Sequence, residues 1–485
     1  MDLHILPNIV SGSLHFQGNL RPVLDFCSNT TVGYVPITPC GVLDEAIKYA
    51  IYSQQKLNAM SRIEICDRVV QASQHLEQLL DDESCLIELA SRSTGYTTRA
   101  IKHGVTNNIL AMRTCTERLE SIFGSRNIQN NTIKPVGPIV GVGSATMPET
   151  LHAIMMCSLL AGCVPTIKND NKRPYLAYMS AEAFRKAGLP VQLVSLDTRS
   201  DMFGVAQFIN RPEFQRVIFM GSLTHAHHIS GYEVLQNLLD LGVSRVQALH
   251  HIERFNSIPQ KYITFVAHLG VSYAHSFSSD RCTEATIRGA SLYRFSCKRT
   301  HLHGIHPEAY LHHKCQLIET AQHADDIHLI QRAPDTSWTT AETAYFTELL
   351  NCGDLIHNGA LKIVEISLNG QDKDSLAKVL ATECQKEVLA LIKADPQDFI
   401  SLCNDISQHL PRKMFLETAL WADLQHPEGQ DTEKLFKANI RSFGLVTNAP
   451  TIHAWGRPAD NVYGSHEGSF IEGLLSYQNS AERIA

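Results

Sequence analysis

Apolar and polar residues alternate through the middle of the chain in the pattern of a βαβ unit. An apolar run at 138–142 predicts a buried strand, a turn of small residues follows at 143–146, and residues 149–161 have helical periodicity. A second apolar strand at 164–167 then ends on Lys168. Because ligands of doubly wound sheets bind beyond the carboxyl ends of the strands, we expect the Lys168 ammonium to hold one.

The same pattern continues on both sides of this unit. The expected helices before it are 43–55, 61–80, 84–93 and 98–123. The expected strands after it are 191–196, 216–222, 246–249, 263–267, 300–302, 361–368, 388–392, 415–420 and 442–448, with helices between them. Residues 1–42 are expected to be irregular with short β-like runs. The alternation predicts an α/β protein with a doubly wound parallel sheet and a second α/β domain.

Composition narrows the class of protein without naming a reaction. The 485 residues exceed one ordinary core and predict two or three domains. Hydrophobic residues make up 44% and charged residues 19%, which is typical of a soluble globular enzyme. The net charge is −7 and no basic block is present, so we expect no nucleic-acid and no membrane partner. We find no secretory signal and no spanning segment, and we expect a cytoplasmic protein.

Cysteine and histidine are both numerous. The thirteen cysteines include no CxxC pair, which favours reduced thiols over a disulfide framework. The twenty-four histidines include adjacent pairs at 227–228, 250–251 and 312–313, whose side chains point in different directions on regular elements. We therefore expect these histidines to be surface or core polar residues and expect no metal site.

Seven short stretches follow one another in the order of motifs known from one enzyme family. They are KPVGPIV at 134–140, SATMP at 144–148, LAGCV at 160–164, AGLP at 187–190, FMGS at 219–222, ECQKEV at 383–388 and FGLVTN at 443–448. In order and spacing they resemble the P-x-G-V, P-W-N-F-P, A-L-A-A-G-N-x-V-V-x-K-P, A-G-L-P, F-T-G-S, E-x-F-G-P-V and G-x-V-x-V-N motifs of the aldehyde dehydrogenase superfamily. The resemblance covers nearly the whole chain and implies an aldehyde dehydrogenase-like fold of two doubly wound α/β domains with a small oligomerisation extension.

The resemblance also implies a division of the chain. The expected parts are 1–124 (the N-terminal helical part of the cofactor domain), 125–135 (an oligomerisation hairpin), 136–249 (a Rossmann-like NAD(P)-binding domain), 250–447 (the catalytic domain) and 448–485 (a C-terminal return and oligomerisation segment). In the family, segments matching 125–133 and 468–484 extend into a partner subunit, so a homo-oligomer, most simply a homodimer, is expected.

A cofactor site is implied in the same way. The resemblance predicts NAD or NADP as cofactor, with Lys168 on the adenosine ribose and Glu383 on the nicotinamide-side ribose. Gly221 and Ser222 would lie near the pyrophosphate, where a helix N-terminus favours anions. Two basic residues close behind Lys168, at 172–173 near Asn169 and Asn171, would tolerate the 2′-phosphate of NADP.

The catalytic motifs depart from the family pattern. The sequence FSCKRT at 295–300 replaces N-x-G-Q-x-C and offers Cys297 as the nucleophile, with two following basic residues that would lower its pKa. Thr146 stands where the oxyanion-binding asparagine is expected. The family's E-L-G-G-K has no counterpart, and Glu253 or His250 could act as the base instead.

Two functions remain open on these grounds. One is an NAD(P)-dependent oxidoreductase that acts on a small-molecule aldehyde or on an acyl thioester. In the second case a thiol rather than water discharges the acyl-enzyme, so no hydrolytic glutamate is needed. Trp455 and Tyr463 are then candidate walls of the substrate tunnel. The other is a catalytically impaired relative that serves as a binding or scaffolding subunit.

Overall fold

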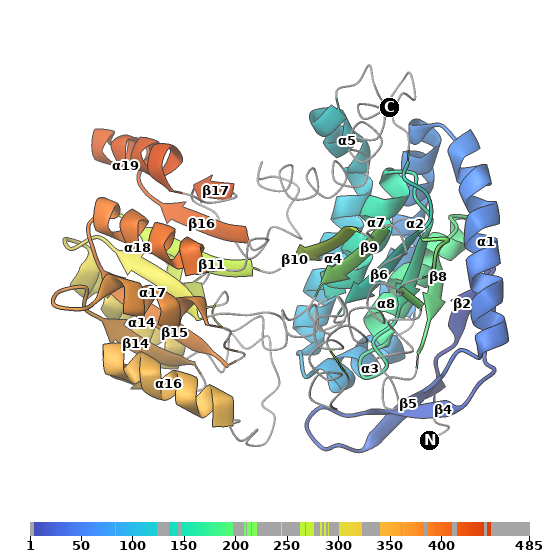
Figure 1. Ribbon diagram of the computed structural model, residues 1–485, viewed down its shortest axis with the longest axis horizontal. Helices are drawn as coiled ribbons and strands as arrows, with labels where there is room; N and C mark the ends of the chain where they lie inside the picture. The colour runs from blue at the N-terminus through green and yellow to red at the C-terminus, as the bar shows by residue number, and fades with distance from the viewer. Residues whose placement is uncertain are drawn as a thin grey trace. The chain divides into compact units, whose positions relative to one another are not determined.

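A computed structural model gives the fold for most of the chain. It describes residues 4–82, 84–123, 135–143, 148–196, 208–209, 211–214, 216–220, 244, 262–266, 268–275, 282–283, 286–287, 290, 300–322, 340–359, 361–382, 384, 386–409, 415–440 and 444–447. The chain forms two compact units (Figure 1). The first comprises Met1–Phe265 with Trp455–Ala485, and the second comprises Val266–Ala454.

The first unit is built on a seven-stranded sheet. Its order is β10 (Tyr262–Val266), β9 (Arg216–Met220), β6 (Ile139–Gly143), β7 (Pro165–Lys168), β8 (Gln192–Val194), β2 (Asn8–Val10) and β3 (Ser13–His15). Strands β9, β6, β7 and β8 run parallel to one another, whereas β2 is antiparallel to both β8 and β3. All five residues of β6 are buried, as expected for a central strand of a parallel sheet.

A second, smaller sheet of the first unit comes from the N-terminal stretch. Strands β1 (His4–Ile5), β5 (Thr31–Pro36) and β4 (Leu20–Leu24) pair in that order, β1 parallel and β4 antiparallel to β5. The expected β-like runs before residue 42 are therefore real strands. They are too short to be delimited by alternation alone.

Seven described helices surround the first unit's sheet. They are α1 (Cys40–Ala59), α2 (Arg62–Asp82), α3 (Ser84–Thr94), α4 (Thr98–Arg113), α5 (Cys115–Phe123), α7 (Pro148–Leu160) and α8 (Tyr175–Lys186). Helix α1 lies against β2, β7 and β8, and α2 packs on both α4 and α8 (Figure 1). The backbone amide of Glu64 donates to Ser61 Oγ at 3.1 Å, so the expected cap of α2 is present.

The single helix expected at 98–123 is wrong. Two helices meet at Thr114, whose backbone leaves the helical region and whose hydroxyl donates to the Leu110 carbonyl at 3.0 Å. A threonine side chain that competes for a backbone carbonyl in this way favours a helix end.

The second unit contains another seven-stranded sheet. Its order is β13 (Gly353–Asn358), β14 (Lys362–Ile366), β15 (Val388–Lys393), β12 (His301–Ile305), β11 (His268–Ala274), β16 (Phe415–Trp421) and β17 (Gly444–Thr447). All neighbours are parallel except β13, which runs antiparallel to β14 at the edge. Strands β11 and β13 were not expected from the sequence.

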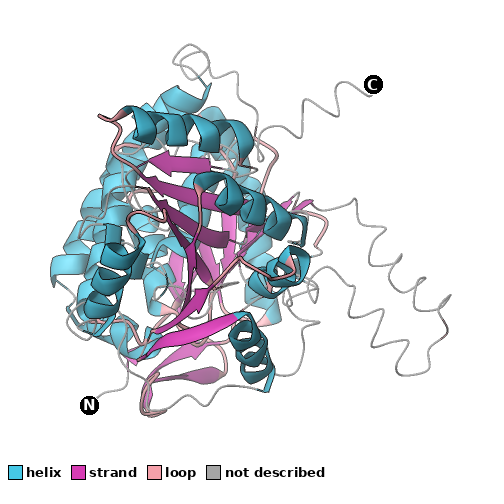
Figure 2. Ribbon diagram, turned by 90° about the vertical axis from the view of Figure 1, so that its left-hand side faces the viewer, coloured by secondary structure: helices cyan, strands magenta, loops and turns pink. Residues whose placement is uncertain are grey.

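Each face of this sheet has its own core, because side chains alternate along the strands. One face packs on α16 (Thr340–Cys352), α17 (Lys373–Ala381), α18 (Pro396–His409) and α19 (Pro427–Asn439). The other packs on α14 (Tyr310–Gln322) and on helical residues at 287 and 290. In Figure 2 the helices (cyan) flank the strands (magenta).

The two parallel-rich α/β units confirm the expected fold class. The core strands expected in the described regions are present, β6, β7, β8, β14, β15 and β16 among them. Among the helices that the structure describes, none is both long and apolar enough to cross a membrane.

Candidate functional site

The carboxyl ends of three parallel strands form the candidate site of the first unit. Val142 of β6 is level with Lys168 of β7, and Gly143 is level with Met220 at the end of β9. Parallel strands place these ends at one edge of the sheet, where doubly wound folds bind their ligands. Lys168 therefore stands where the sequence predicted it, at the end of a buried strand and at the binding edge.

The Lys168 ammonium lies in an unusual electrostatic setting. Burial lowers the pKa of Lys168, nearby Asp170 opposes that change, and the positive charges of Arg21 and Lys172 lower it further. The Lys168 side chain forms no ion pair or hydrogen bond with any described residue. A partly buried ammonium beside two other cations is a site for an oxygen-rich or anionic group.

Arg21 was not foreseen as part of this site. It lies on β4 of the small N-terminal sheet and acts on Lys168 through space. Its position far upstream in the sequence carries no motif, so only the folded arrangement reveals it.

The loop after β7 is tied to the neighbouring strand β8. The backbone amide of Asn169 donates to the Val194 carbonyl at 2.8 Å, and Asn171 Nδ2 donates to the Leu196 carbonyl at 2.5 Å. Both asparagines are buried. Asn171 holds the loop through its side-chain amide, whereas Asn169 does so through its backbone, and the side-chain oxygens of both asparagines have no hydrogen-bond partner among the described residues.

The two basic residues of this loop have different surroundings. Arg173 Nη1 pairs with Asp170 Oδ2 at 3.8 Å, whereas the side chain of Lys172 is exposed. The amide of Lys172 donates to Asp170 Oδ1 at 3.0 Å, which closes an Asx turn. Lys172 is the better candidate to bind an added phosphate, because the Asp170 carboxylate forms its ion pair with Arg173.

The turn before β7 is held by one buried glutamine of α1. Gln54 Nε2 donates to the Gly162 carbonyl at 2.7 Å, and the amide of Val164 donates to Gln54 Oε1 at 2.9 Å. Gly162 has a φ of 80°, and a Cβ there would lie 2.0 Å from Arg62 Nη1. The stretch LAGCV therefore requires glycine at 162, both for its positive φ and for the close approach of the Arg62 side chain.

His152 is the buried titratable group of the helix that follows β6. Its Nδ1 lies 3.1 Å from Ser180 Oγ, and its ring stacks on Phe184. Burial lowers the pKa of His152 from its ordinary value of 6.5 to about 3. It is a neutral core imidazole at physiological pH, unsuited to act as a base on a ligand.

Most residues predicted for the reaction lie outside the described part of the chain. They are Thr146, Gly221, Ser222, His250, Glu253, Cys297, Glu383, Trp455 and Tyr463, together with the expected oligomerisation segments 125–133 and 468–484. Of the predicted cofactor residues, the described structure therefore locates Lys168. The others stay predictions.

Comparison with known proteins agrees with this arrangement. Residues 17–243 match the aldehyde dehydrogenase family profile. No curated protein sequence matches the chain.

Several solved structures share the fold. A 1-pyrroline-5-carboxylate dehydrogenase of Thermus thermophilus has 11% identity and a TM-score of 0.70, with 98% of this chain and 92% of that chain covered. Aldehyde dehydrogenase 21 of Physcomitrella patens, in complex with succinate, has 14% identity and a TM-score of 0.68, with coverage of 93% and 91%. An NADP-dependent glyceraldehyde-3-phosphate dehydrogenase of Bacillus halodurans, complexed with NADP, has 13% identity and a TM-score of 0.67, with coverage of 96% and 97%.

Identities this low establish the fold and leave the substrate open. The fold extends over both units, and the family profile covers the part of the chain that carries the βαβ unit and Lys168. The chain therefore has the fold of the aldehyde dehydrogenases, and its residues 17–243 match the profile of that family.

Proposed function

We propose that the chain is an NAD(P)-dependent oxidoreductase that acts on an aldehyde or an acyl thioester through Cys297. Family and fold support an aldehyde oxidoreductase. The observation that carries the cofactor part is the Lys168 ammonium at the carboxyl end of β7, beside two further cations.

The described residues around Lys168 fit the sugar and phosphate groups of a dinucleotide. NAD or NADP, when bound, supplies the acceptor for a hydride. Lys168 donates hydrogen bonds to the oxygens of the adenosine ribose, while Asn169 and Asn171 keep its loop on β8. Gly221, Ser222 and Glu383 complete the proposed contacts at the pyrophosphate and the second ribose.

The proposed chemistry at the substrate is nucleophilic. The Cys297 thiolate attacks the carbonyl carbon, and the Thr146 hydroxyl donates to the oxyanion that forms. For an aldehyde, Glu253 takes a proton from the water that releases the acid. In the acylating reaction a thiol, in place of water, takes the acyl group from Cys297 and leaves as the acyl thioester. In the reverse direction an acyl thioester transfers its acyl group to Cys297 and releases that thiol, so neither direction needs a hydrolytic base.

The charges beside Lys168 favour NADP over NAD. Arg21 and the exposed Lys172 raise the positive potential at the position proposed for the adenosine ribose. A 2′-phosphate adds about two negative charges there, whereas the NAD ribose adds none. We expect NADPH to bind more tightly than NADH, and the preference to fall in Lys172→Met.

Calorimetric titration of the full chain with NADPH and NADH tests the cofactor proposal. Loss of one charge-assisted hydrogen bond costs about 1.5–3 kcal/mol, so Lys168→Met is expected to bind roughly 10–150-fold more weakly. Lys48→Met, which removes an exposed lysine of α1, is the matched control and should bind as the wild type does. Equal affinities in all three proteins would refute the role of Lys168.

The second function, a binding or scaffolding subunit, is favoured by the same departures from the catalytic motifs. It predicts no turnover with any aldehyde or acyl thioester, even where the cofactor binds. Cofactor binding without turnover would favour the scaffolding subunit over the enzyme.

We also propose that the protein is a cytoplasmic homo-oligomer. All the described cysteines are free thiols, which supports a reducing compartment. The oligomer rests on fold analogy alone. A monomer mass in light scattering would refute it.

A further inference from the structure

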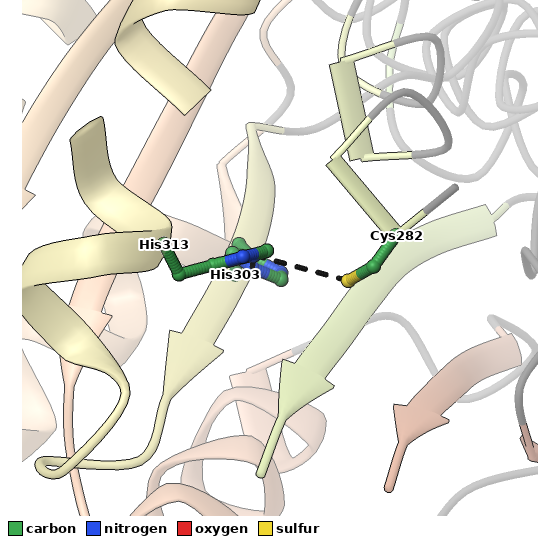
Figure 3. A group of neighbouring side chains, drawn as sticks. All are labelled: Cys282, His303 and His313. Atoms are coloured by element: carbon green, nitrogen blue, oxygen red, sulfur yellow. Dashed lines mark hydrogen bonds between the residues drawn. The ribbon is translucent and has the colours of Figure 1, made fainter. Parts of the chain in front are cut away.

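One thiol and two imidazoles converge inside the second unit. Cys282 lies in a helical stretch after β11, His303 is on β12, and His313 is on α14 (Figure 3). None of the three side chains is exposed to solvent. The Cys282 sulfur points towards the imidazoles, and the three candidate donor atoms all lie within 4.8 Å of one another.

The separations are close to those of metal ligands. His303 Nε2 lies 3.0 Å from His313 Nε2, and Cys282 Sγ lies 3.8 Å from His313 Nε2. A tetrahedral zinc with Zn–N of about 2.0–2.1 Å and Zn–S of about 2.3 Å places its donors roughly 3.3–3.6 Å apart. Shifts of a few tenths of an ångström would bring each of these two pairs to the spacing of zinc ligands, and the third pair, Cys282 and His303, has its donor atoms within 4.8 Å of one another.

A serine orients the first histidine from the other side. Ser272 is level with His303 in the β11–β12 pairing, and its Oγ lies 2.6 Å from His303 Nδ1. The same Oγ lies 2.9 Å from His301 Nε2. One consistent direction is His303 Nδ1–H donating to Ser272 and the hydroxyl donating to His301. It leaves the lone pair of His303 Nε2 facing the centre, as metal-binding histidines require.

Protonation favours the ligand form of both imidazoles. Burial lowers the pKa of His303 well below 6.5, and the neighbouring His313 and His301 lower it further. Burial lowers the pKa of His313 to about 4, with His312 acting in the same direction. Burial raises the pKa of the Cys282 thiol, so that this group is protonated until a metal displaces the proton.

The charged residue next to His313 in sequence is already paired with a carboxylate. Lys314, next to His313, is paired with Glu365 of β14 at 2.5 Å between Nζ and Oε2. Cys282 packs in an apolar cluster with Ala274, Ala419 and Trp421. Neutral nitrogen donors and a thiol in a buried site, with no carboxylate among the three, favour zinc over calcium or magnesium.

We propose that Cys282, His303 and His313 bind one zinc ion. Binding forms one Zn–S bond and two Zn–N bonds, releases the Cys282 proton to solvent, and changes no oxidation state. Without metal, the hydrogen bond between the two Nε2 atoms needs one proton, which His313 Nε2 carries. On zinc binding, that proton moves to Nδ1 of His313. A water molecule takes the fourth position, and its acidity near neutral pH lets the site lose its remaining positive charge.

The expected consequence is structural. The ion would join β12, α14 and the helical stretch that leads, in sequence, towards Cys297. This proposal departs from the sequence-based expectation that the histidine pairs hold no metal, and it is independent of the proposed oxidoreductase activity.

Metal analysis of the full chain tests the site. After removal of metal with a chelator and titration with Zn²⁺, the wild type should bind one tight equivalent. Cys282→Ser and His313→Gln should each lose that equivalent, or bind it more than about 100-fold more weakly. Cys403→Ser is the matched control, because Cys403 on α18 is also fully buried, with a thiol pKa raised by burial alone. It should retain full binding.

Two measurements on the wild type keep the proposal testable if a variant fails to fold. Substitution with Co²⁺ should give the visible absorption of a tetrahedral site together with a thiolate charge-transfer band. The apparent zinc affinity should rise at least about tenfold per pH unit between pH 6 and 8, because the Cys282 proton is released on binding and the zinc-bound water releases a second proton as it ionises. No tight equivalent, a cobalt spectrum without thiolate, or an equivalent retained in both ligand variants would overturn the proposal.

Discussion

Replacing Gln54 by leucine removes the clamp that ties α1 to the turn before β7. Leucine has nearly the same volume and no polar atoms, so the change isolates the hydrogen bonds from any cavity. The Gly162 carbonyl and the Val164 amide then lose their partner at 2.7 and 2.9 Å, in a place where Gln54 is only 6% exposed.

The magnitude follows from those two groups. A buried polar group left without a partner costs about 1–3 kcal/mol, and burial of the leucine side chain offsets part of the sum. We expect a net loss of about 2–4 kcal/mol of folding free energy in the first unit. For a domain of that size, this lowers the thermal midpoint by about 4–16 °C.

Differential scanning calorimetry of the full chain at one protein concentration measures this loss. The control is Gln55→Leu, an exposed neighbour on the same helix, which should shift the midpoint by less than about 2 °C. A Gln54→Leu midpoint equal to that of the control would refute the clamp. Because the clamp positions the strand that ends at Lys168, cofactor affinity should fall as well.

Two further perturbations test the cofactor half of the fold. Gly162→Ala forces a non-glycine residue to a φ of 80° and places a methyl 2.0 Å from a buried guanidinium, whereas Gly370→Ala meets the same backbone cost at 78° with nothing within 4 Å. Chemical unfolding should show a loss of about 1 kcal/mol for Gly370→Ala and clearly more for Gly162→Ala, and equal losses would contradict the close approach. His152 should make stability depend on pH, because its pKa falls from 6.5 to about 3 on folding. The free energy of unfolding that the neutral His152 contributes is fully present above pH 6.5. It declines as the pH falls towards 3, because the unfolded chain binds the proton at a higher pH than the folded chain does. The stability difference between wild type and His152→Gln should therefore shrink by about 2 kcal/mol between pH 7.5 and 5. A constant difference would show that His152 does not titrate in this way.

The apolar pattern of the sequence predicted the central strands of both sheets. Strands β6 and β15 are buried on both faces and consist almost entirely of apolar residues, which sequence patterns detect most readily. Strand β11 was missed because Gly270 and polar Ser272 interrupt its apolar pattern. Strand β13 was missed because it is a largely exposed edge strand that pairs only with β14 among the described strands.

The candidate site was foreseen in part. Lys168 could be placed because a lysine that ends an apolar strand is a strong local signal. The positive charge of Arg21 at the same site could not, since it depends on a sheet formed by residues remote in sequence. The cluster of Cys282, His303 and His313 was hidden for the same reason: its members come from three elements and show no ligand spacing.

The most direct test of the central claim is turnover in the wild type and in Cys297→Ala. The full chain is mixed with NAD or NADP, or with their reduced forms, and a panel of aldehydes and acyl thioesters, and the absorbance of the reduced nicotinamide is followed. Cys315→Ala removes an exposed thiol of α14 and serves as the control. The proposal predicts turnover in the wild type and the control, and a loss of at least about 10³-fold in Cys297→Ala. Turnover that is unchanged in Cys297→Ala, or absent from the wild type across the panel, would contradict it.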